Sequence, residues 1–247
     1  MGGDCRKSAS VGSCVPRRRA RSTLAVATAF RTGLAAVLAC AALQVAATQV
    51  TVRDAASGEA LENAVVEVFV EGVAARDVNV GAEVIQRDAA FVPHVTAVRV
   101  GSAVGFPNRD TTRHHVFSFS PAKAFEIKLY LKDEPPPIRF ERAGVVVLGC
   151  NIHDHMLAFI VVSEATAFAI TGAEGRAAFA DLPPGQHRLR VWHPRLEDTH
   201  QQWWEGHIDA DVPREVALEL RASPPPESRP SALQLRFRKA LEGEQPR

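Results

Sequence analysis

The sequence predicts an all-β protein, and two observations support this fold class. Short runs rich in Val, Ile and Phe recur at intervals of about ten residues, separated by Gly, Pro, Asn and Asp. One run, residues 124–131, alternates apolar and polar side chains, as a strand with one face on a core does. The chain has 247 residues and is 46% hydrophobic, which is enough for one large or two small globular domains.

Charge is distributed unevenly, although the formal net charge of the chain is only +1. Seven of the 29 basic residues and one of the 28 acidic residues precede Thr48, so 22 basic and 27 acidic residues follow. This balance excludes a strongly basic nucleic-acid-binding protein. Three of the four cysteines also precede Thr48, so Cys150 has no partner for an intrachain disulfide in the body of the chain.

The first element is a leader over residues 1–47. Basic residues precede an apolar run at 33–47, and the small residues at its end fit cleavage after Ala47. We therefore expect a cleaved signal peptide and a periplasmic protein in an oxidising compartment. A membrane-anchoring helix and a lipoprotein anchored at Cys40 are the alternatives. No later apolar run is long enough for a helical span, so no transmembrane segment is expected in the mature chain.

The body then offers eleven candidate strands, at residues 49–53, 64–70, 94–100, 104–107, 115–119, 124–131, 145–148, 157–163, 177–182, 187–193 and 215–220. In the alternating run, the side chains expected to face a core are Phe125, Ile127, Leu129 and Leu131, and those expected to face outward are Glu126, Lys128, Tyr130 and Lys132. Residues 222–247 are rich in Pro, Ser and charge and predict a flexible tail, with a weak helix candidate at 231–242.

The segment from Cys150 to Met156 carries the main chemical signal. It presents Cys150, His153 and Met156 with two residues between successive ligands. Two imidazoles and a thiolate with a weak axial thioether describe a mononuclear blue-copper site. The second imidazole has to come from elsewhere, and a turn-rich stretch upstream delivers His114 and His115 at the start of a strand.

On these motifs, residues 77–163 resemble a cupredoxin, the plastocyanin, azurin and amicyanin family. The shared features lie at 91–95, 100–110, 114–116 and 150–156, and the ligand spacing is similar to that of amicyanin. The whole chain is similar to bacterial plastocyanin-like chains of the "methylamine utilization protein" type. The resemblance implies a Greek-key β-sandwich.

The resemblance also implies the ligands and the function. One type-1 copper per chain would be held by His114, Cys150 and His153, with Met156 as axial ligand. Strand parity instead suits a core-facing His115, and His155 is a further imidazole that competes with Met156, so both choices stay open. The implied activity is one-electron transfer with a redox protein such as a c-type cytochrome or a periplasmic dehydrogenase.

A second module is indicated on either side of this segment. Residues 48–76 and 164–221 resemble the opening and closing parts of a carboxypeptidase-regulatory-like, or transthyretin-like, β-sandwich. We expect one such sandwich with the cupredoxin domain, 77–163, inserted in it. Two successive β domains are the alternative.

Three functions follow from the sequence: electron transfer, copper delivery or storage, and a structural or binding β-sandwich protein that no longer holds copper. An enzyme is not expected, and no catalytic residue is assigned. The His-x-His pairs of a trinuclear copper centre are missing outside the Cys150 loop, and no G-x-S-x-G elbow supports a serine hydrolase.

Overall fold

The computed structural model describes residues 47–75, 81–132 and 134–222, and these residues form 17 β-strands and no α-helix. The all-β fold class expected from the sequence is therefore confirmed. The leader expected over 1–47 and the tail expected over 222–247 lie outside the described residues, apart from Ala47 and Ala222, as does the helix candidate at 231–242. Within the described ranges, no helix has the length and apolar character needed to cross a membrane.

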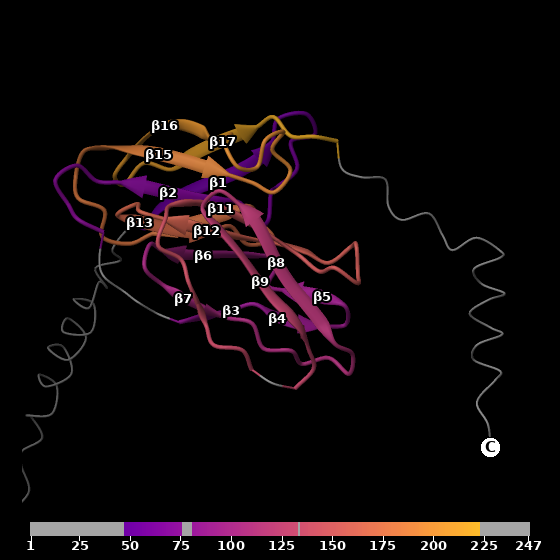
Figure 1. Ribbon diagram of the computed structural model, residues 1–247. Helices are drawn as coiled ribbons and strands as arrows, with labels where there is room; N and C mark the ends of the chain where they lie inside the picture. Colours follow the sequence, from indigo (N-terminus) through magenta and orange to yellow (C-terminus); the bar gives the residue numbers. More distant parts are fainter. Residues whose placement is uncertain (1–46, 76–80, 133, 223–247) are drawn as a thin grey trace, which may run out of the picture. The chain divides into compact units, whose positions relative to one another are not determined.

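The strands between residues 82 and 163 pair among themselves (Figure 1). The largest sheet has five strands in the order β6 (Val95–Arg99), β12 (Leu157–Ser163), β11 (Gly144–Gly149), β8 (His114–Ser120) and β9 (Lys123–Tyr130). A smaller sheet has the order β10 (Ile138–Arg139), β7 (Ala103–Gly105) and β3 (Ala82–Glu83). A hairpin is formed by β4 (Ile85–Arg87) and β5 (Ala90–Val92).

The remaining strands come from both ends of the described chain. One sheet has the order β14 (Arg176–Phe179), β1 (Thr48–Asp54) and β17 (Arg214–Leu218). The other has the order β13 (Ala167–Ile170), β2 (Val65–Phe69), β15 (Gln186–Trp192) and β16 (Trp204–Asp209). Figure 1 shows the consequence in its colours, because the indigo β1 lies beside the yellow β17 and the purple β2 lies beside the orange β15.

Three hydrophobic clusters hold these sheets together. The first fills the space between the five-stranded sheet and the strands β5 and β7, and the second fills the space between the two sheets built from the chain ends. The third joins the two groups, because Phe159 and Val161 of β12 share it with Trp192 of β15 and Val65 of β2. Strand β12 is therefore buried on both faces, which explains why its sequence is a nearly continuous apolar run.

The alternation expected in β9 holds only for its first part. Phe125 and Ile127 pack against the first cluster, but Leu129 is 51% exposed and Tyr130 is buried. The reason is a register shift opposite the start of β8, where β8 advances two residues and β9 advances three. Such a bulge reverses the side-chain alternation beyond it. The expectation that Leu129 faces the core and Tyr130 faces outward is therefore wrong.

A buried histidine gives this fold a pH-dependent stability. His193 is 6% exposed, its Nε2 lies 3.2 Å from the Glu62 carbonyl oxygen, and its Nδ1 accepts the N–H of Arg195. Burial lowers the pKa of His193 to about 4. The unfolded chain binds a proton at this residue near pH 6.5, so folding stability is lost as the pH falls from there through the folded pKa.

We therefore expect the free energy of unfolding to drop by about 2 kcal/mol between pH 7 and pH 5 because of His193 alone. Urea denaturation at both pH values measures this drop. His193→Gln is the control, and it should remove most of this dependence. Parallel curves for the two proteins would show that His193 does not carry it.

Candidate metal centre

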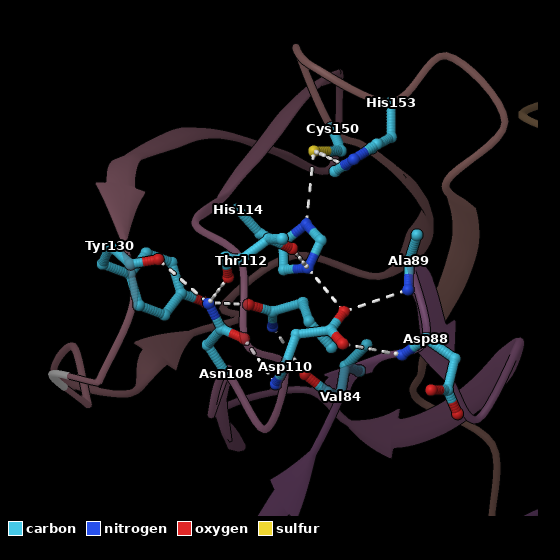
Figure 2. Close-up of polar contacts among 11 residues, drawn as sticks. Val84, Asp88, Ala89, Asn108, Asp110, Thr112, His114, Tyr130, Cys150 and His153 are labelled. Atoms are coloured by element: carbon cyan, nitrogen blue, oxygen red, sulfur yellow. Dashed lines mark hydrogen bonds and ion pairs between the residues drawn. The ribbon is translucent and has the colours of Figure 1, made fainter. Parts of the chain in front are cut away.

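Three side chains with metal-binding atoms converge at one end of the five-stranded sheet. They are His114 at the start of β8, Cys150 directly after β11, and His153 in the loop that leads to β12. The Cys150 Sγ lies 4.0 Å from the His114 Nδ1 and 3.8 Å from the His153 Nδ1 (Figure 2). Each residue contributes one ligand atom, and the three atoms lie within 4.8 Å of one another.

Local pairing explains why the chain brings these residues together. Strands β8 and β11 are antiparallel neighbours, and Gly149 pairs with Phe117, so Cys150 emerges beside the first residues of β8. The loop then closes on itself, because the Met156 N–H donates to the His153 carbonyl oxygen at 2.9 Å. Strand β12 begins at the next residue, so the loop between the two strands is short and fixed at both ends.

Gly149, immediately before Cys150, lies against an aromatic ring. A Cβ added at Gly149 would lie 2.8 Å from the Phe117 Cζ, which is closer than real side chains approach. The Phe117 ring therefore covers the strand at this point. A side chain at position 149 would require the Phe117 ring to move, and the pairing of Gly149 with Phe117 sets the position of β11 against β8, one residue before the cysteine.

The adjacent histidines of β8 point to different places. His114 is fully buried and faces Cys150, whereas the His115 Nε2 lies 2.9 Å from the Glu126 Oε1 on β9. Strand alternation in the sequence places His115 on the same face as Phe117 and Phe119, and this apolar face was expected to point into the core. It is the outer face, because Phe119 is 85% exposed. The apolar alternation of β8 therefore misidentified the buried side of the strand.

Met156 and His155 also differ clearly in burial. Met156 is 2% exposed and belongs to the same core cluster as Cys150. His155 is exposed, and its ring centroid lies 5.9 Å from that of His153. Of the two residues that the sequence offered as a fourth ligand, the structure therefore buries Met156 and leaves His155 on the surface.

A carboxylate lies behind His114 and was not singled out as a site residue from the sequence. The Asp110 Oδ2 lies 2.7 Å from the His114 Nε2, on the opposite side of the ring from Cys150 (Figure 2). The N–H of Ala89 holds the pKa of Asp110 below its usual range, His114 and the N–H of Asp88 act in the same direction, and burial opposes them. Its position four residues before His114 was the only signal in the sequence.

A buried polar network supports this corner of the site. The Asn108 side chain donates to the carbonyl oxygens of Thr112 and Tyr130, at 2.9 and 3.0 Å, and accepts the N–H of Asp110 at 2.9 Å. The Tyr130 hydroxyl is hydrogen-bonded to Gln86 and to the Phe106 carbonyl oxygen. Burial raises the pKa of Tyr130 to about 12, so this hydroxyl stays protonated.

The donor set fits a borderline or soft transition-metal ion. For metal–sulfur and metal–nitrogen bonds of about 2.3 and 2.0 Å in a trigonal plane, sulfur and nitrogen would lie about 3.7 Å apart. The two observed separations are 4.0 and 3.8 Å. One thiolate and two imidazoles are ligands for copper and zinc rather than for calcium or magnesium.

Comparisons with known proteins give a likeness in structure only. No protein family matches the sequence, and no curated protein matches it. Amicyanin from Paracoccus versutus is 24% identical with a TM-score of 0.32, over 40% of this chain and 97% of amicyanin. A Cu-containing nitrite reductase from Thermus scotoductus is 24% identical with a TM-score of 0.33, over 40% of this chain and 25% of the reductase. A reduced mutant of amicyanin is 24% identical with a TM-score of 0.31, over 40% of this chain and 98% of that chain.

Proposed function

We propose that this chain binds one copper ion in a type-1 site and transfers single electrons between redox partners. The observation that carries the proposal is the convergence of the His114 Nδ1, the Cys150 Sγ and the His153 Nδ1. A trigonal set of two imidazoles and a thiolate is the donor set of a blue-copper site, in which bound copper supplies a reversible one-electron couple. Met156, buried beside Cys150 in the core, is the proposed axial ligand.

The fold supports electron transfer because the ligands come from rigid strands and from one short loop. His114 and Cys150 are buried, so the chain holds them in one arrangement whichever charge the site carries. His153 is half-buried, and Ile152 beside it is 48% exposed. We place electron exit at His153 for this reason. A small apolar surface around a partly exposed ligand suits the brief contacts of redox proteins.

The proposed setting is the periplasm. The leader-like residues 1–47 and the single cysteine of the body fit an exported protein whose thiol is occupied by a metal. A c-type cytochrome or a periplasmic dehydrogenase is the proposed class of partner. We do not propose a catalytic role for the chain.

The proposed domain organisation is a cupredoxin domain, 77–163, inserted in a second sandwich made from 48–76 and 164–221. Its support is the strand pairing, because β1 and β2 pair with strands that follow residue 163. The inserted strands pair with one another. The second sandwich is proposed as a structural support, since Trp192 packs against Phe159 of the five-stranded sheet.

Copper delivery or storage is the second candidate function. The observation that favours it is the exposed His155 beside His153, because a second imidazole at the surface can receive a metal ion from another protein or pass one on. Slow electron exchange in a protein that binds copper tightly would favour this function over electron transfer.

The visible absorption spectrum after addition of Cu(II) tests the proposal. The exported protein is expected to develop an intense blue thiolate-to-copper band that reaches its maximum at one equivalent. Cys150→Ser should lose the band completely, because a hydroxyl does not replace the thiolate. A colourless protein, or the same pale colour in both samples, would contradict a type-1 site.

A further inference from the structure

The carboxylate of Asp110 is fixed by the fold. Its side chain is 15% exposed, and its two oxygens accept the N–H groups of Asp88 and Ala89, at 3.1 and 3.0 Å (Figure 2). These donors form the turn of the β4–β5 hairpin, with φ values of 53° and 52°. Two successive left-handed residues are unusual outside glycine and allow the tight hairpin turn. The turn thus directs two N–H groups at one carboxylate.

The carboxylate in turn determines which nitrogen of His114 faces the cysteine. With Asp110 2.7 Å from Nε2, that nitrogen carries the proton and donates it, so the lone pair is on Nδ1. Nδ1 is the atom that lies 4.0 Å from the Cys150 Sγ. The hydroxyl of Thr112 is a weaker second neighbour of Nε2, at 3.4 Å. His114 is fully buried, so water does not compete for either nitrogen.

We propose that Asp110 is a positioning residue that holds His114 as a ligand and biases the bound copper toward its oxidised state. The inference rests on the proposed function. A fixed negative charge beside a ligand stabilises the more positive state of the metal and lowers its reduction potential. Because the carboxylate is mostly buried, solvent screens this effect only weakly.

The test compares two carboxylate-to-amide substitutions, each next to a histidine of β8. Asp110→Asn removes the charge behind His114, and Glu126→Gln removes a charge 2.9 Å from His115, where the carboxylate is 59% exposed. The readout is a redox titration of the copper-loaded protein, followed at the blue band. Asp110→Asn is expected to shift the Cu(II)/Cu(I) equilibrium about tenfold toward Cu(I), which is about 59 mV for a one-electron couple. Glu126→Gln is expected to shift it less than about twofold.

Two outcomes overturn the inference while the proposed function stands. One is an unshifted potential in a blue Asp110→Asn protein, and the other is an equal shift in both variants. A wild-type protein that shows no blue band overturns the proposed function, and the inference with it. These results are distinguishable because the wild-type spectrum is recorded first.

A second variant tests the inference if Asp110→Asn fails to fold. Thermal unfolding of the metal-free proteins would reveal such a failure. Asp110→Glu keeps the charge and lengthens the side chain by one methylene. Its potential is expected to stay within about twofold of the wild-type equilibrium, with a visible spectrum altered by the displaced His114 ring. A tenfold shift toward Cu(I) in Asp110→Glu would overturn the role of the charge.

Discussion

Replacement of His114 by alanine is expected to abolish the blue-copper spectrum and to weaken copper binding by at least about 100-fold. The substitution removes one of the three atoms that converge at the site and leaves the mostly buried Asp110 carboxylate without its histidine partner. Competition titration with a chromophoric copper chelator measures the affinity, and the visible spectrum reports the geometry.

His115→Ala is the matched control. It removes the same side chain from the next residue of the same strand, and His115 is also buried. The partner of the His115 side chain is Glu126 rather than a residue of the Cys150 site. Copper affinity and the blue band are therefore expected to persist in this variant. Loss of copper binding in His115→Ala alone would contradict this prediction, because it would show that the ligand is His115 and not His114.

Replacement of Trp192 by alanine is expected to destabilise the fold by about 4 kcal/mol. Trp192 is fully buried, its ring lies 5.3 Å from the ring of Phe159, and its indole N–H donates to the Thr199 carbonyl oxygen at 2.8 Å. The substitution leaves a large cavity in the cluster that joins the two groups of strands. Urea denaturation followed by far-ultraviolet circular dichroism measures the change in the free energy of unfolding.

Phe119→Ala is the control for this prediction. It also removes an aromatic ring from a strand, but Phe119 is 85% exposed, so its change in stability is expected to stay within about 0.5 kcal/mol. A Trp192→Ala protein as stable as Phe119→Ala would show that the cluster around Trp192 does not hold the strands together.

The strands were predictable where a long pattern marks them. The apolar run at 157–163 predicted β12 at its observed bounds, because a strand buried on both faces needs apolar residues at nearly every position. Strands such as β3 and β10 have two residues each and carry no periodicity. Their positions depend on pairing with β7, which no local pattern records.

The site was predictable in part for a similar reason. Cys150 and His153 stand in one loop, and their spacing alone suggests a shared metal. The choice between His114 and His115 depends on which face of β8 is buried. The apolar side chains of Phe117 and Phe119 suggest the wrong face, because both lie on the outer face. Asp110 depends on a hairpin at 85–92 that meets it only in the folded chain.

The pairing of β1 has a consequence for the order in which the protein folds. Val50 pairs with Ala177 on one side and with Arg214 on the other, so both strands that pair with β1 come after the strands from 82 to 163 in the sequence. Contacts between such distant residues form slowly, because a long loop must close first. The strands that the structure describes from 82 to 163 pair only with one another. The histidine and cysteine cluster can therefore assemble, and become ready to capture its metal, before the strands at the two ends of the described chain have met.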